Sequence, residues 1–297
     1  MTHRRAVALM VLVTLLWSMA GVVTRHLDAA RSFEVTFWRS AFNALALVVA
    51  LSWWRGFGLW RGLLGAGRAV WISGVCWAVM YTAFMVALTL TSVANVLVTM
   101  AIAPLLTALL SRFLLGHRLP ARTWLAIIVA GAGIAWMFGT QAGDGTLLGS
   151  LVACAVPLAG AVNLTVLQKV GKDATVAVDM LPAVLIGAVL SAAVTLPLAW
   201  PLQASGHDLG LLALLGIVQL AVPCLLMVRL TRQLPAPEIA LLALLEVIFG
   251  VAWAWLGAGE APSVSVLLGG ALVLAALVGN ELLALRRPPL RPERAAG

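Results

Sequence analysis

The chain has 297 residues, of which 63% are hydrophobic and only 10% charged, and its mean hydropathy is +1.06. Soluble domains carry about 25% charged residues, so this composition excludes an ordinary soluble domain, a disordered chain and a disulfide scaffold. Because a transmembrane helix needs about 20 apolar residues, the apolar content suffices for about nine or ten spans. So little of the chain is left over that its function must reside within the membrane.

Ten apolar segments follow one another, separated by short connections. They predict transmembrane helices at residues 6–24, 35–53, 69–89, 92–115, 121–139, 147–168, 179–200, 209–230, 236–256 and 264–285. The first segment is long enough to span and lacks a convincing cleavage site, so we interpret it as a retained helix and not as a signal peptide. The predicted fold class is an all-α polytopic membrane protein.

Basic residues are distributed unevenly between the two sides of the predicted helices. With the N-terminus in the cytoplasm, 16 of the 19 Lys and Arg residues fall on the cytoplasmic side, against Arg25 and Arg31 outside. Cytoplasmic segments of membrane proteins are enriched in Lys and Arg. The pattern predicts a multi-pass protein of a bacterial-type inner (plasma) membrane with both termini cytoplasmic. The net charge of +8 is scattered over short loops, which argues against a nucleic-acid partner.

The two halves of the chain resemble each other weakly, around turns at 116–118 and 259–261. Each half holds five predicted spans, an odd number, so the second half would be inverted relative to the first. Arginines lie near the first turn and none near the second, as inversion predicts. We therefore predict five-helix repeats at 1–140 and 141–297, the second with a short basic tail, within one membrane domain. Inverted repeats commonly form transporters whose substrate site lies near the bilayer midplane.

Short motifs in both halves resemble the drug/metabolite transporter (DMT) superfamily, in particular its ten-helix EamA type. They are Trp17-Ser18, Arg39, Ala103-Pro104-Leu105 with Gly116-His117-Arg118-Leu119, Leu245-Glu246 and Gly259-Glu260. Two positions depart from the family pattern, because His117 replaces the usual Glu and Val247 replaces the usual Pro. The resemblance covers about residues 6–285. The small residues, Met and Trp within the spans are similar to the branch that exports amino acids and related metabolites.

The resemblance implies a secondary transporter that exports small metabolites, with amino acids as the first choice, by alternating access. Import, or another solute such as a nucleoside or a drug-like amine, stays open. A membrane-embedded enzyme acting on lipid-linked substrates is the alternative from a different class. The sequence contains no zinc-helix, nucleophile-turn or phosphate-loop motif, so we expect no enzyme activity, cofactor or metal. The expected partners are a small-molecule substrate and the lipid bilayer, with protons as a candidate coupling ion and the oligomeric state open.

Three prolines interrupt predicted spans, namely Pro104, Pro157 and Pro223. Each removes the hydrogen bond to the carbonyl four residues earlier. A freed carbonyl in lipid needs protein, water or a ligand as its partner. We predict hinges or kinks at these positions, with a plain packing kink as the alternative.

Six residues are predicted to bind substrate: Trp17, Trp77, Tyr81, Asn163, Gln219 and Glu246. Trp77 and Tyr81 are four residues apart and share a helix face. Aromatic rings could stack on an apolar side chain or meet an ammonium group, with core packing as the alternative. Asn163 and Gln219 are polar within spans, where a hydrogen bond between helices is the alternative role.

Glu246 is the eleventh residue of its 21-residue predicted span and so lies near the midplane. A charge at that depth is costly, which calls for a partner, water or a proton. Three roles compete: a hydrogen bond to a neighbouring helix through Gln219, proton coupling, and contact with a substrate amine. Arg39, nearer the outer interface, is expected to extend outward to the interface or to pair with Asp28 or Glu34; a substrate carboxylate is its alternative partner.

Overall fold

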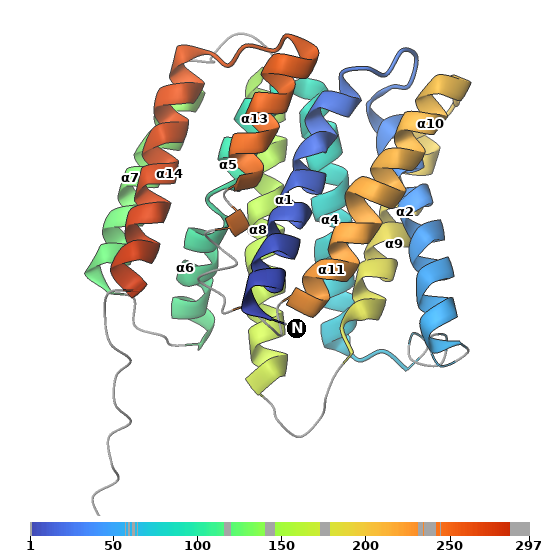
Figure 1. Cartoon of the computed structure of the whole chain (residues 1–297), viewed down its shortest axis with the longest axis horizontal. Coiled ribbons are helices and arrows are strands. Elements are labelled where there is room, and N and C mark those ends of the chain that lie inside the picture. The colour runs from blue at the N-terminus through green and yellow to red at the C-terminus, as the bar shows by residue number, and fades with distance from the viewer. Residues whose placement is uncertain are drawn as a thin grey trace, which may run out of the picture.

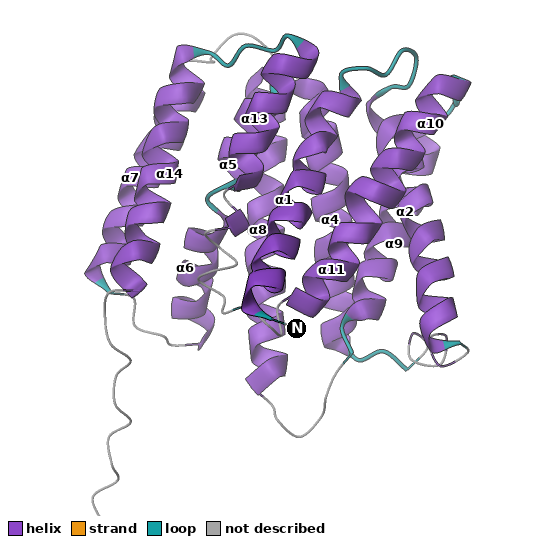
Figure 2. Ribbon diagram, viewed as in Figure 1, coloured by secondary structure: helices purple, strands orange, loops and turns teal. Residues whose placement is uncertain are grey.

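The computed structural model consists of helices and the connections between them, with no strand among the described residues (Figure 2). It describes residues 2–56, 65–115, 120–139, 146–172, 179–230 and 245–285, and the single positions 58, 60, 63, 234, 242 and 243. The predicted turn at 116–118, the predicted repeat boundary between residues 140 and 141 and residues 236–241 of the ninth predicted span lie outside the described residues.

The helices follow the predicted spans closely. In the first half they are α1 (His3–Thr24), α2 (Ser32–Arg55), α4 (Arg68–Leu90), α5 (Val93–Met100), α6 (Ala103–Leu115) and α7 (Ala121–Gly139). In the second half they are α8 (Thr146–Lys172), α9 (Leu181–Ala199), α10 (Gly206–Leu214), the π-helical η1 (Leu215–Ala221), α11 (Val222–Leu230), α13 (Leu245–Ala258) and α14 (Val264–Leu285). Among the described residues, seven spans are long and apolar enough to cross a membrane, and three shorter apolar helices complete the predicted ten.

The two halves run in opposite directions through the bundle (Figure 1). Helix α1 begins at the lower end of Figure 1, where the N-terminus is marked, whereas α8, the first helix of the second half, begins at the upper end. The predicted architecture of ten helices in two inverted five-helix repeats is confirmed. The connections α1–α2, α4–α5, α9–α10 and α13–α14 therefore all lie at the upper end.

The surface of the bundle is suited to lipid. Large apolar side chains face outward along the helices, and tryptophans are exposed near both ends, with Trp53 89% and Trp200 74% exposed. Tryptophan is enriched at membrane–water interfaces. Helices can cross the lipid because each one satisfies its backbone hydrogen bonds internally.

Small residues let some helices touch through their backbones. A Cβ at Gly133 of α7 would lie 2.8 Å from the carbonyl oxygen of Gly269 in α14, and a Cβ at Gly269 would lie 2.7 Å from that of Gly133. These two helices form the flank seen at the left of Figure 1. Close packing of this kind replaces the hydrophobic effect as the attraction between helices in lipid.

The three predicted proline hinges differ in their surroundings. The fourth span is interrupted between Met100 and Ala103, immediately before Pro104. Pro223 follows η1, and π-helical turns are frequent at functional sites. Helix α8 continues through Pro157 without interruption. Whether any of the three acts as a hinge stays a prediction.

Candidate functional site

A buried polar centre joins the two repeats in the interior of the bundle. Arg39 of α2 donates from Nε and Nη2 to the Oε1 atom of Gln219 in η1, at 3.2 and 2.9 Å. The Nε2 atom of Gln219 donates to the backbone carbonyl of Trp17 in α1, at 3.1 Å. Arg39 and Gln219 are each only 2% exposed. Helices from both halves of the chain thus meet at one guanidinium group.

The expectation that Arg39 extends to the interface or pairs with Asp28 or Glu34 is wrong. Its side chain is buried, and its guanidinium lies 5.6 Å from the centre of the Phe84 ring in α4. The Gln219 oxygen and the negative face of that ring compensate part of the charge of the buried guanidinium. Asp28 and Glu34 have other partners, described below.

Local packing holds Arg39 beside Gln219. A Cβ at Gly216, in the same turn of η1, would lie 2.6 Å from the Arg39 carbonyl oxygen and 2.6 Å from Cβ of Phe42. Only glycine allows η1 to approach α2 this closely. The glycine at position 216 therefore permits the close packing that places Gln219 beside Arg39.

Tyr81 belongs to the same centre, and its ring packs on that of Trp77, as their spacing of four residues predicted. The two rings lie 5.4 Å apart at 34°. The hydroxyl of Tyr81 contacts the Sγ atom of Cys224 at 3.7 Å, and Tyr81 and Cys224 both lie close enough to Arg39 to interact with its charge. Trp17, by contrast, joins the centre through its backbone carbonyl.

Glu246 faces the centre from the second repeat. It lies in the first turn of α13, and its carboxylate attracts the Arg39 guanidinium electrostatically, although the two make no ion pair within 4 Å. Twelve residues separate it from Ala258 at the upper end of α13, or about 18 Å of helix. No hydrogen bond joins Glu246 to Gln219 in the described part of the chain; the Gln219 amide accepts from Arg39 and donates to the Trp17 carbonyl.

Asn163 lies apart from this centre. Its Oδ1 accepts a hydrogen bond from Ser73 Oγ at 2.6 Å. Asn163 and Ser73 are each 17 residues from the upper ends of α8 and α4, or about 26 Å, whereas Arg39 is about 10 Å from the upper end of α2. A substrate role for Asn163 stays a prediction, without support from proximity to Arg39.

The sequence reasoning missed Asn43, which is completely buried on α2. It follows Arg39 by four residues, so both project from the same face of the helix. That spacing was the available signal: a second polar residue one turn below a membrane arginine.

At the upper end, Arg25 links three connections. Its Nε forms an ion pair with Glu260 Oε2 at 2.7 Å, while Nη1 and Nη2 donate to the carbonyls of Leu88 and Thr91 at 2.5 and 2.8 Å. Glu260 Oε1 also accepts from the backbone N–H of Val93 at 2.6 Å. The end of α1 and the α4–α5 connection are thereby attached to the α13–α14 connection of the other repeat.

Asp208 makes a second link at this end. Its buried carboxylate accepts from the backbone N–H groups of residues 28–30, at 2.8 to 3.0 Å, and of Ser205, at 3.2 Å. Asp28, His207 and Asp208 are close enough to suggest a metal site. The four backbone donors already occupy the Asp208 oxygens, and His207 Nδ1 lies 3.2 Å from Asp28 Oδ2, so anchoring of the α1–α2 connection accounts for the cluster.

Glu34 makes the third link. It is 1% exposed, and its Oε1 accepts from the backbone N–H groups of Gln203 and Ala204, both at 2.8 Å. Each of the three links joins the first half of the chain to the second. We call the carboxylates of Glu34, Asp208 and Glu260 with their partners the upper-end network.

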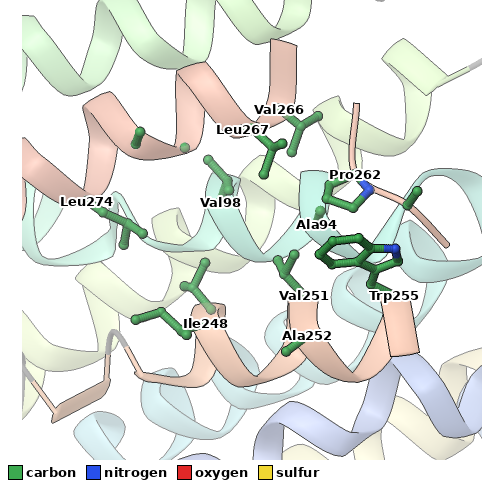
Figure 3. Close-up of a pocket in the computed structure, with 14 residues that line it drawn as sticks. Ala94, Val98, Ile248, Val251, Ala252, Trp255, Pro262, Val266, Leu267 and Leu274 are labelled. Atoms are coloured by element: carbon green, nitrogen blue, oxygen red, sulfur yellow. The ribbon is translucent and has the colours of Figure 1, made fainter. Parts of the chain in front are cut away.

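A separate pocket of about 420 Å³ lies between α5, α13 and α14 (Figure 3). Val98, Val251 and Leu274 point into it, with Trp255 and Pro262 at one side. Its lining is aliphatic and aromatic, and Trp255 is 57% exposed, so in a membrane this groove faces lipid. It suits a hydrocarbon chain and offers little to a charged solute.

The sequence profile of the EamA-like transporter family matches the chain twice, at residues 4–139 and 147–280. The chain belongs to this family. It is accordingly a member of a family of transporters and not of enzymes, which excludes the alternative of a membrane-embedded enzyme.

The other comparisons concern the fold. One solved structure, described only as a crystal structure of a protein, is 22% identical, with a TM-score of 0.66 over 96% of this chain and 100% of its own. At that identity the likeness shows a shared fold alone. No curated protein matches the sequence.

Proposed function

We propose that this EamA-family protein exports small metabolites, foremost amino acids, across the inner membrane by alternating access. The observation that carries the proposal is the upper-end network, in which three carboxylates join the repeats at one end of the bundle. These links are polar and lie in connections between helices. They can therefore exchange for water when the repeats separate, whereas the buried centre around Arg39 lies deeper, between the repeats.

The proposal assigns the upper end to the outside. The basic asymmetry of the sequence supports this orientation, since 16 of 19 Lys and Arg residues fall at the opposite side and in the tails. The two repeats, residues 1–140 and 141–297, then move relative to each other about the centre. In this state the outer side is closed, and the protons that drive export would titrate Glu246.

Counterflow in proteoliposomes tests the proposal directly. Purified protein is reconstituted into vesicles preloaded with one unlabelled solute, and entry of the labelled solute is followed. The panel contains the twenty L-amino acids and four nucleosides, with and without a pH gradient. We expect counterflow with at least one amino acid, accelerated by the gradient, and no counterflow in vesicles without protein.

Counterflow of nucleosides alone would support transport but contradict amino acids as the substrate. Amino-acid counterflow at the same rate with and without a pH gradient would contradict proton coupling and leave the rest of the proposal standing. Solute entry that continues without any solute inside the vesicles, and that does not saturate, would indicate a channel and contradict alternating access.

A further inference from the structure

Arg39 is a buried cation whose charge is only partly compensated. Charged side chains within a membrane are costly, and they pair with one another or face a substrate pathway. In the part of the chain that the structure describes, no carboxylate lies within ion-pair distance of Arg39; its direct partners are the neutral Gln219 oxygen and the Phe84 ring. The guanidinium therefore retains the capacity to bind an anion.

Three of the buried hydrogen-bonding atoms that lack a partner among the described residues lie on one face of α2. Among the described residues, the Nη1 atom of Arg39 and both amide atoms of Asn43 are buried without a hydrogen-bond partner. The Asn43 amide lies near the Tyr81 hydroxyl without reaching good hydrogen-bond geometry. Buried polar groups are nearly always satisfied, so unsatisfied ones in adjacent turns of one helix need an explanation such as a ligand.

We propose that Arg39 Nη1 and the Asn43 amide bind the carboxylate of the transported solute, which makes that solute a small carboxylic acid with an amino group. The two N–H donors match the two oxygens of a carboxylate. The Asn43 Oδ1 atom remains as an acceptor for the solute ammonium, and Glu246 supplies negative charge from the other repeat. This site rests on the proposed transport function and defines its substrate class.

The arrangement is preorganised for this role. Gln219 accepts two of the guanidinium N–H groups, which fixes the plane of Arg39, and is itself held by the Trp17 carbonyl. Gly216 holds η1 against α2 at the same level. The remaining donor, Nη1, therefore keeps its position without a substrate. Groups held in place in this way lose little freedom when a ligand binds.

The test compares acids with their amides in proteoliposomes. Counterflow is measured with labelled L-leucine, L-phenylalanine and L-threonine, with the corresponding amino-acid amides as competitors, and with labelled uridine. An amide keeps the ammonium group and the side chain but lacks the carboxylate. We expect the acids to compete and the amides to compete at least tenfold more weakly.

Variants locate the site. Asn43→Ala should raise KM for the amino acid roughly ten- to a hundredfold, the loss for one hydrogen bond to a charged group. Arg39→Lys keeps the charge but not the planar fork and should raise KM likewise. Arg68→Gln, which removes an exposed positive charge at the start of α4, is the control and should leave KM unchanged. The melting temperature of each purified variant, with and without amino acid, separates loss of binding from loss of folding.

Equal competition by acids and amides overturns the carboxylate site, as does an unchanged KM in correctly folded Asn43→Ala and Arg39→Lys. Transport of uridine without any amino acid also overturns it while leaving the transport function standing. Binding alone gives an independent check: if none of the carboxylate solutes raises the melting temperature of the wild-type protein, the site is overturned as well.

Discussion

Removal of the Arg25 side chain should open the upper end of the bundle. Arg25→Ala deletes the ion pair with Glu260 and the hydrogen bonds to the Leu88 and Thr91 carbonyls. If the upper-end network exists only in the state that is closed at this end, its loss shifts the population toward the open state.

The magnitude follows from the exposure of these groups. The Arg25 and Glu260 side chains are 27% and 21% exposed, so their ion pair contributes no more than about 1 kcal/mol. The hydrogen bonds from Arg25 to the Leu88 and Thr91 carbonyls join groups of the same repeat, so they do not oppose separation of the two repeats. The ion pair with Glu260, at about 1 kcal/mol, therefore corresponds to a shift of up to about fivefold in the ratio of closed to open states.

A cysteine at Ala254 can report the opening. Ala254 is 2% exposed on α13, between Gly250, which packs against Leu97 of α5, and Gly257, which packs against Val22 of α1. In a background with the three native cysteines replaced by alanine, a membrane-impermeant maleimide is applied from outside. Ala254→Cys should react slowly alone and up to about fivefold faster when combined with Arg25→Ala. The matched control is Arg31→Ala, which removes an exposed positive charge at the same end.

Equal labelling rates in the Arg25→Ala and Arg31→Ala backgrounds would refute the reasoning, because the network would then not oppose opening. Faster labelling only from the cytoplasmic side would refute the assigned orientation. A fall in melting temperature without faster labelling would mean that Arg25 stabilises the fold and does not gate it.

Three further predictions follow from the same structure. A cysteine replacing Asp144 should react with an impermeant reagent from outside and one replacing Arg118 should not; reaction of both from one side would contradict the orientation. Gly216→Val should drive η1 from α2 and abolish transport, with a loss of about 2 kcal/mol or more in stability, checked by thermal unfolding. Asp208→Asn should lower the melting temperature, because a neutral amide replaces a carboxylate that accepts four backbone hydrogen bonds.

The spans and their number could be predicted because they depend on local properties. About 20 consecutive apolar residues are needed to cross lipid, whichever helices later pack together. The Trp77–Tyr81 contact was accessible for the same reason, since residues four apart in a helix always share a face. The inversion of the second repeat could be predicted because each half of the chain holds an odd number of spans.

The partners of Arg39, Glu34 and Asp208 could not be predicted, because they come from distant parts of the chain. Arg39 meets Gln219 only because Gly216 admits α2, and Glu34 binds backbone groups that carry no mark in the sequence. Every residue except proline offers the same backbone N–H donor, whatever its side chain. The sequence therefore does not distinguish a buried carboxylate bound by backbone N–H groups from an exposed acidic residue in a loop.

Glu246→Gln separates the remaining roles of the one carboxylate that, among the described residues, faces the centre from α13. The substitution keeps the size and hydrogen-bonding capacity of the side chain but removes its ionisation, and with it the attraction to Arg39. If Glu246 carries the coupling proton, the variant should keep solute exchange and lose acceleration by a pH gradient. If it contacts the substrate ammonium, KM should rise about tenfold or more with or without a gradient, since a hydrogen bond to a charged group is lost.

The two outcomes differ because exchange needs substrate binding but no net proton movement, whereas a gradient can act only through a group that ionises. Counterflow and gradient-driven uptake are therefore measured on the same vesicles, with Arg68→Gln as the charge control. A rise in KM for amino acids but not for their amides would point to Arg39, whose counter-charge has changed, and not to Glu246 itself. Unchanged transport in both assays, at an unchanged melting temperature, would reject both functional roles and leave Glu246 as a structural residue beside the buried cation.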